Sequence, residues 1–220
     1  CEVAMEIQQK KARSKYTEAM TLANAHASVL AWVRPIQTLL PPFQEAYFQG
    51  MKSGNSEPAM WSLVYVQVMV PFFMGKPLMP LLADCGLGLN QIQEVRQKDQ
   101  EVIFKLFLQM FLNLTGQSEE KTSLEGDLFS RKNFVSQSPV HDATVDFVQL
   151  NLYIFFGDME AAANLAIESD GKYAKAAPGF FLGQIETFHR GIALYAFARQ
   201  TQKGKYKKHA KKVLKTITKW

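Results

Sequence analysis

The sequence predicts an all-α protein in which helix hairpins stack on one another. Two observations carry that prediction. Helical signals dominate and are divided by Gly, Pro and capping residues, and no segment alternates apolar and polar residues as a half-buried strand does. With 220 residues, of which 47% are hydrophobic and 20% charged, the chain is long enough to bury a substantial core.

In the first half of the chain, turn-forming and capping residues separate five helical segments. The first closes before Arg34-Pro35, and Gly54, which can adopt a left-handed backbone, ends the second. Ser56 is the expected N-cap of the third, with Pro58 in its first turn, where the missing N–H is harmless. The predicted segments are residues 2–33, 42–53, 57–75, 81–97 and 100–115.

The second half opens with a long loop over residues 117–138, which are rich in Ser, Glu and Lys and show little periodicity. Ser138 is the expected cap of the helix that follows, Gly157 ends that helix, and Asp158 caps the next. A second loop is predicted over residues 170–183. The predicted helices are residues 139–157, 159–169, 185–200 and 205–219.

Short turns join these helices into pairs, and the order of residues around the turns recurs. In LYIFFGDMEAAANLAIES, Tyr153 and Phe156 precede a Gly-Asp turn, and Ala162 and Ala166 follow at a spacing of one helical turn. Small residues there let two helix axes approach to about 8 to 10 Å. This pattern is similar to tetratricopeptide repeats. The strings PLLADC, NLTGQ, FFGDMEAAANLA, FHRGIALYAFARQT and KYKKHAKKVLKTITKW resemble the degenerate helical-repeat region of large multidomain signalling proteins.

The resemblance covers the whole chain. It implies one right-handed superhelical array over residues 1–220, which accompanies an AAA-type ATPase module and kinase, histidine-kinase or nucleotide-cyclase modules. Since the chain begins with Cys1 inside a helical segment, we expect a piece of a longer protein. The implied partners are other proteins or neighbouring domains of the same chain.

No residue set predicts a catalytic, cofactor-binding or nucleotide-binding site. Gly171-Lys172 is followed by Tyr173, where a phosphate-binding loop needs Ser or Thr. Gly86 and Gly88 lack the third glycine and the preceding strand of a dinucleotide site, so we interpret them as a junction between helices. We therefore expect a chain that is not an enzyme.

The histidines do not predict a metal site, because they form no HxxxH pair and have no cysteine at ligand spacing. His141 and Asp142 are adjacent, and adjacent residues on a helix point about 100° apart, so a base with its orienting acid is not favoured. The four histidines are His26, His141, His189 and His209.

Cysteine content favours one kind of compartment, and hydropathy argues against a membrane span. Cys1 and Cys85 lie far apart and form no CxxC motif, which favours a reducing compartment, and we expect the cytoplasm. The longest apolar run, residues 63–73, is interrupted by Gln67 and Pro71 and is shorter than the roughly 20 residues of a membrane span.

The chain ends in a basic segment, KGKYKKHAKKVLKTITKW, with eight lysines and no acid. An apolar stripe is predicted along its helix, and the lysines fill the opposite face. A solvated face is favoured over contact with an acidic partner, a phosphate backbone or anionic lipid, and nucleic acid is the weaker form of that alternative. The predicted stripe is Tyr206, Ala210, Val213, Leu214, Ile217 and Trp220, and the lysines that would make such a contact are Lys207, Lys208, Lys211 and Lys212.

These observations lead to one functional expectation and one alternative. We expect a non-catalytic region for protein interaction and regulation, without cofactor or metal. The alternative is a stand-alone helical domain with a small-ligand pocket near the Phe/Met-rich residues 69–79. The aromatic pairs are favoured as core rather than as a peptide groove. These pairs are Phe72-Phe73, Phe155-Phe156 and Phe180-Phe181.

Overall fold

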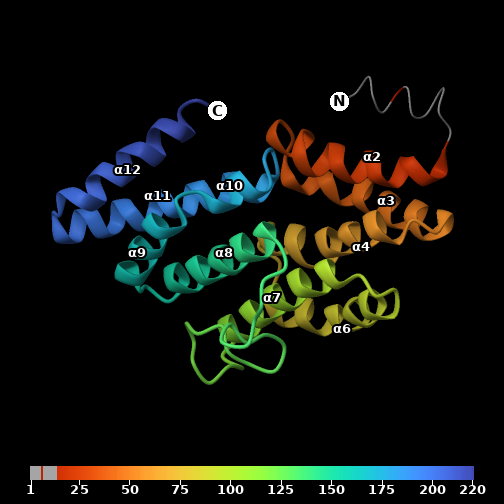
Figure 1. Cartoon of the computed structure of the whole chain (residues 1–220), viewed down its shortest axis with the longest axis horizontal. Coiled ribbons are helices and arrows are strands. Elements are labelled where there is room, and N and C mark those ends of the chain that lie inside the picture. Colours follow the sequence, from red (N-terminus) through yellow and green to blue (C-terminus); the bar gives the residue numbers. More distant parts are fainter. Residues whose placement is uncertain (1–5, 7–13) are drawn as a thin grey trace. The chain divides into compact units, whose positions relative to one another are not determined.

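A computed structural model describes residue 6 and residues 14–220. Helices dominate it, and within these residues the β-type pairing is limited to one isolated bridge between Glu125 and Ser130 (Figure 1). The predicted all-α class is confirmed. The chain forms two compact units, Cys1–Leu108 and Gln109–Trp220.

The first unit contains α-helices joined by short turns of 3-10 and π helix. The prediction for residues 2–33 falls partly outside the described residues, and its described part forms α2 and a 3-10 turn. The elements are α2 (Lys15–Ser28), η2 (Leu30–Trp32), η3 (Ile36–Leu39), α3 (Leu40–Ser53), α4 (Ser56–Val64), the π turn η4 (Tyr65–Met69), α5 (Val70–Phe73), α6 (Leu78–Glu94) and α7 (Lys98–Leu114), which continues into the second unit.

The turn between α3 and α4 lies where the sequence predicted it, with a difference of one residue in the N-cap. Gly54 takes a left-handed conformation, with a φ of 75°, at the end of α3. The N-cap position of α4 is Asn55 and not Ser56, because Ser56 is already helical, and the Asn55 side-chain amide donates to the Tyr16 carbonyl at 2.8 Å. The prediction was wrong by one residue.

The predicted helix over residues 57–75 is instead three pieces, α4, η4 and α5. Pro71 lacks an N–H, so it cannot bond the carbonyl of Gln67 four residues earlier, and the backbone widens into a π turn just before it. The Sγ of Cys85 on α6 lies 3.6 Å from that carbonyl and donates to it. Gly86 and Gly88 lie inside α6 and not at a junction; a Cβ on Gly88 would overlap the Gln67 side chain, so glycine allows this close contact.

In the second unit, residues 115–138 join α7 to α8 without a helix, and Asn113 anchors them. Its side-chain amide nitrogen lies 3.1, 3.1 and 2.7 Å from the carbonyl oxygens of Glu120, Lys121 and Ser123, which share its two N–H donors. The helices that follow are α8 (Pro139–Phe155), α9 (Met159–Ser169), α10 (Lys172–Ala176), α11 (Phe181–Thr201) and α12 (Gly204–Ile217).

Both predicted caps in this unit are present. Ser138 Oγ accepts from the His141 N–H at 3.2 Å, and Asp158 Oδ1 accepts from the Ala161 N–H at 3.0 Å. The predicted loop over residues 170–183 was wrong in part, because it contains α10 and the start of α11. The short α10 is held by Tyr173, whose side chain is buried.

The second unit packs as successive antiparallel helices, with α9 against α8, α11 against α9, and α12 against α11 (Figure 1). Alanines make the contact of α9 with its neighbours close. Ala162 and Ala166 are fully buried, in one cluster with Leu194 and Tyr206, as their spacing predicted.

We expect Ala162→Leu to destabilise the chain by about 1 to 3 kcal/mol, because a larger side chain at this contact forces α9 away from its neighbours. Urea unfolding measures the change. Glu168→Leu, at an exposed position of the same helix, serves as the control and should change stability by no more than about 0.5 kcal/mol. An unchanged denaturation midpoint for Ala162→Leu would remove this residue from the contact.

Candidate functional site

The last helix, α12, carries the basic segment and packs against α11 through only part of the predicted stripe. Tyr206, Ala210 and Val213 are buried, and the Tyr206 ring meets Phe197 edge-on at 4.8 Å. Leu214 and Trp220, in contrast, are 46% and 53% exposed, so their placement in the buried stripe was wrong. Since successive residues turn by about 100°, Leu214 points sideways when Val213 points at α11.

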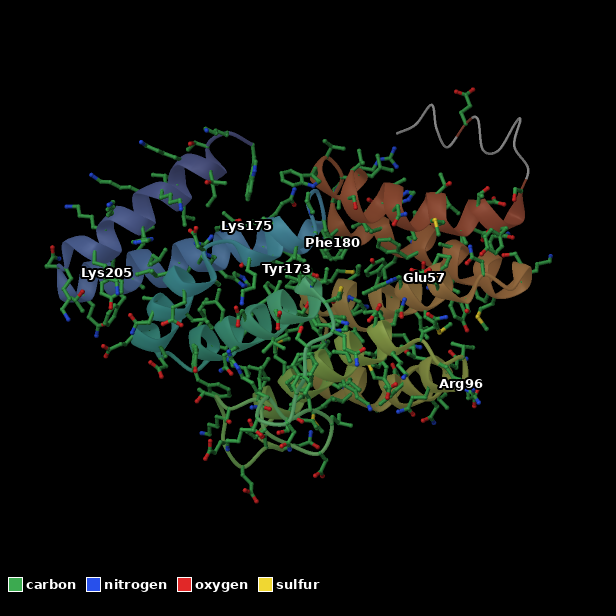
Figure 2. The ribbon with its side chains drawn as sticks, viewed as in Figure 1. Glu57, Arg96, Tyr173, Lys175, Phe180 and Lys205 are labelled. Atoms are coloured by element: carbon green, nitrogen blue, oxygen red, sulfur yellow. The ribbon has the colours of Figure 1, made fainter. Side chains whose placement is uncertain are left out.

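The lysines of α12 take different directions. Lys207, Lys208 and Lys211 are exposed, and a shallow depression of about 590 Å³ runs along this side of the helix. Lys212 instead reaches back to Asp170 at the end of α9, with Nζ 2.9 Å from Oδ1. Figure 2 shows Lys205 at the start of α12, where its Nζ lies 5.5 Å from the centre of the Tyr206 ring. The depression is lined by Gly204, Lys207, Lys208, His209, Lys211, Lys212 and Lys215.

Truncating adjacent residues of α12 distinguishes the buried strip from the exposed side. Val213→Ala is expected to cost about 1 to 3 kcal/mol, because Val213 is 3% exposed and its truncation leaves a cavity against α11. Leu214→Ala should cost less than about 1 kcal/mol despite the larger loss of side chain. Urea unfolding of both variants checks the order, and a larger loss for Leu214→Ala would contradict it.

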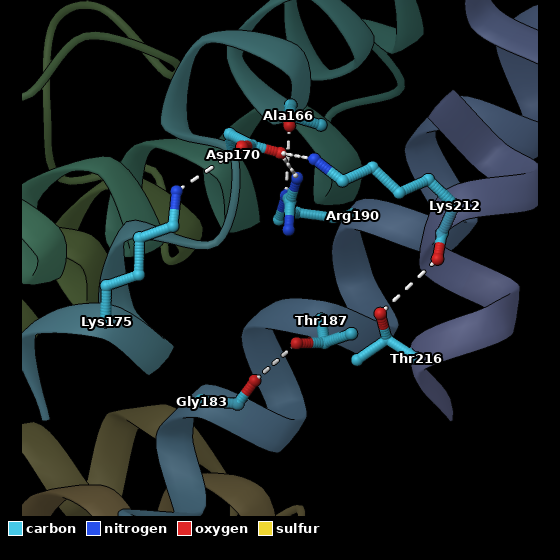
Figure 3. Close-up of polar contacts among 8 residues, drawn as sticks. All are labelled: Ala166, Asp170, Lys175, Gly183, Thr187, Arg190, Lys212 and Thr216. Atoms are coloured by element: carbon cyan, nitrogen blue, oxygen red, sulfur yellow. Dashed lines mark hydrogen bonds and ion pairs between the residues drawn. The ribbon is translucent and has the colours of Figure 1, made fainter. Parts of the chain in front are cut away.

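Asp170 is the centre of an ion cluster between α9, α10, α11 and α12 (Figure 3). One carboxylate meets three cations: Lys212 at 2.9 Å, Lys175 at 3.3 Å and Arg190 at 3.4 Å. The hydrogen bond from Lys212, together with Lys175, lowers the pKa of Asp170 to about 2. The carboxylate is therefore charged at neutral pH and already holds Lys212, which is the least available of the four predicted contact lysines.

Arg190 is the buried member of this cluster. Its side chain is 7% exposed, and its Nε donates to the Ala166 carbonyl at 2.9 Å. One turn earlier on α11, Glu186 is 1% exposed; burial raises its pKa, while the charge of Arg190 opposes that rise. A depression of about 250 Å³ beside the cluster is lined by Asp170, Gly171, Ala174, Lys175, Thr187, Arg190, Lys212, Val213 and Thr216.

A second charged group lies on α8. Asp146 is 8% exposed and binds Lys172 at 2.5 Å and Arg131 at 3.4 Å. These contacts tie α10 and the long loop to α8, so they hold the fold together. Neither ion cluster has the arrangement of a nucleophile with its base.

The aromatic pairs divide between core and surface. Phe181 is buried, whereas Phe155 and Phe156 are 56% and 36% exposed, so the core prediction was wrong for that pair. Phe155 lies in the last turn of α8 and Phe156 just beyond it, where the turn to α9 leaves side chains uncovered.

Two further buried groups, Cys85 and His26, lie outside these ion clusters. Burial raises the pKa of the Cys85 thiol to about 12, so this sulfur is not a nucleophile at neutral pH. His26 is buried, and its Nδ1 lies 2.8 Å from the Leu22 carbonyl. Across the described residues, no three His, Cys, Asp or Glu side chains gather as a metal site would require.

One depression in the first unit lies beside the Phe/Met-rich segment, with a volume of about 480 Å³. Met69 itself is buried in the core, and Met79 is 60% exposed. The lining residues are Leu40, Gln44, Val66, Gln67, Pro71, Lys76, Pro77, Pro80, Leu81 and Asp84.

Comparison with family models, curated proteins and solved structures finds no match for this chain. None of the helices in residues 14–220 has the length and apolar character that a membrane crossing requires.

Proposed function

We propose that the chain is a non-catalytic interaction and regulatory region, built as a right-handed array similar to tetratricopeptide repeats, within a multidomain cytoplasmic signalling protein. The observation that carries this proposal is the close packing of α9 on α11 through Ala162 and Ala166. Successive hairpins that meet through small residues leave long helix faces for partners, as helical-repeat proteins do.

The gene that encodes the chain provides the first test. We expect its reading frame to encode an AAA-type ATPase, kinase, histidine-kinase or nucleotide-cyclase module beside this region. The purified module should bind the purified chain with one-to-one stoichiometry in calorimetry. A reading frame without any such module contradicts the proposal.

Catalysis by the chain itself is a second test. The purified chain should hydrolyse ATP no faster than a mock preparation from cells that do not express it, since the chain contains no phosphate-binding loop. Turnover that persists through further purification and is absent from the mock preparation would contradict a non-catalytic role.

A small-ligand domain is the second candidate, and the depression beside Gln67, Pro71 and Lys76 favours it, because its volume of about 480 Å³ is in the range of ligand pockets. Thermal shift against a library of metabolites distinguishes the two. A hit whose stabilisation is lost in Gln67→Ala would favour the ligand domain.

A further inference from the structure

Helix α11 carries a stripe of large apolar side chains that face solvent. Phe188, Ile192 and Tyr195 are 56%, 38% and 44% exposed. Their spacing of i, i+4 and i+7 places them on one side of the helix over two turns. Single exposed apolar residues are ordinary, but a row of three on one helix face indicates a contact surface.

The position of α12 decides which side of the hairpin this stripe occupies. Gly191 faces α12, because a Cβ there would lie 3.3 Å from Cγ1 of Val213. Arg190, one residue before, turns to one side and meets Asp170. Ile192, one residue after, turns by about 100° to the other side.

Helix α12 repeats the same geometry around Val213. Lys212, one residue before, reaches Asp170 on the side of α9 (Figure 3). Leu214, one residue after, points to the opposite side and is 46% exposed. Lys207 and Lys211 precede Leu214 by seven and three residues, so they lie on the same side of α12.

The two helices thus share a surface on the side of the hairpin away from Asp170, which we name the outer face. It combines an apolar centre with a basic border. Its members are Phe188, Ile192 and Tyr195 of α11 and Lys207, Lys211 and Leu214 of α12, all exposed.

We propose that the outer face binds an amphipathic helix whose apolar stripe is flanked by Asp or Glu. The inference rests on the proposed function and names the partner's chemistry. The apolar stripe of the partner helix covers Ile192 and Leu214, and its flanking carboxylates meet Lys207 and Lys211. The sequence of α12 contains no acidic residue that could pair with these lysines. The exposed residues of α11 and those of α12 each form a row along their helix, so a partner helix laid beside the hairpin contacts each row over two turns.

Charge and apolar content select this partner over others. A second copy of the same face would bring Lys207 and Lys211 against their own like charges. A nucleic-acid backbone would pair with the lysines but would leave Phe188, Ile192 and Leu214 without an apolar counterpart. An acidic amphipathic helix satisfies both parts of the face.

Synthetic helical peptides of about 18 residues provide the probe, and fluorescence anisotropy measures their binding to the full chain. The first peptide carries Leu on one side and Glu on both flanks, with Ala and Gln elsewhere. A second replaces each Glu by Lys, and a third keeps Glu but replaces each Leu by Gln. We expect saturable one-to-one binding of the first peptide only.

Variants of the chain locate the site. Ile192→Asp should weaken binding by about tenfold or more, because it places a carboxylate in the apolar centre. The double variant Lys207→Gln/Lys211→Gln should weaken binding about three- to tenfold and flatten its dependence on salt. The matched control, Lys52→Gln/Lys98→Gln, removes the same charge from exposed positions of the first unit, outside α12, and should leave binding unchanged.

Several results would overturn the inference. The peptide results that would do so are no binding of the Leu/Glu peptide up to about 1 mM, or equal binding of the peptide with Gln in place of Leu. The variant result is equal weakening of binding by the two lysine double variants. A dimer of the chain in sedimentation that Ile192→Asp dissociates would also do so. The peptide test is independent of the gene that encodes the chain. Failure of the peptide to bind therefore leaves the proposed signalling role standing, and a reading frame without signalling modules leaves the outer face standing.

Discussion

Replacing Arg190 by methionine should destabilise the chain by about 3 to 5 kcal/mol, measured by urea unfolding at pH 7. Methionine fills much of the volume of the arginine stem but removes the guanidinium. Glu186, only 1% exposed, would lose its neighbouring cation, and the Ala166 carbonyl would lose the donor that now lies 2.9 Å away. A buried charge without a partner costs far more than an exposed one.

Two further variants separate this mechanism from a loss of packing. Arg199→Met, on an exposed position of the same helix, should change stability by no more than about 0.5 kcal/mol. Adding Glu186→Gln to Arg190→Met should restore part of the loss, because the unpaired charge is then removed. If the loss of unfolding free energy in the double variant equals the sum of the losses in the two single variants, Arg190 and Glu186 do not act as a pair.

The caps of α8 and α9 are one part of the fold that the sequence could predict. The ends of α8 and α9 follow from Ser138 and Asp158, whose side chains bond backbone N–H groups three residues later. The helix α10 was missed for the opposite reason. A five-residue helix has little stability of its own, and burial of Tyr173 against Phe147 of α8 stabilises it.

The surface of α12 could be predicted only in part, because exposure depends on how many neighbours a helix has. The sequence indicated that Lys207, Lys208 and Lys211 face solvent. This prediction did not depend on which helix packs against α12. Leu214 was misplaced because α12 packs along a single strip on α11. The pairing of Lys212 with Asp170, 42 residues earlier, has no signal in either segment alone.

Lowering the pH should reduce the unfolding free energy of the chain through protonation of His189 on α11. Burial lowers its pKa from the usual 6.5 to about 4, and its ring stacks on Phe147 with centroids 6.3 Å apart. The folded state therefore binds a proton less readily than the unfolded chain. Its stabilising contribution is complete above pH 6.5 and is lost as the pH falls towards 4, by about 2 to 3 kcal/mol at about pH 4.5.

Other groups titrate nearby, so the test compares two proteins at two pH values. Asp170 loses its contribution only as the pH falls below 3.8 towards 2, outside the window, whereas Glu186, with its raised pKa, adds stability as the pH falls towards 4.5. His189→Phe keeps an aromatic ring against Phe147 and cannot be protonated. Between pH 7 and about pH 4.5, the unchanged chain should lose about 2 to 3 kcal/mol more unfolding free energy than this variant, because the remaining titrating groups, His26 among them, are common to both. Equal acid losses in the two proteins would show that His189 is as easily protonated in the folded chain as in the unfolded one.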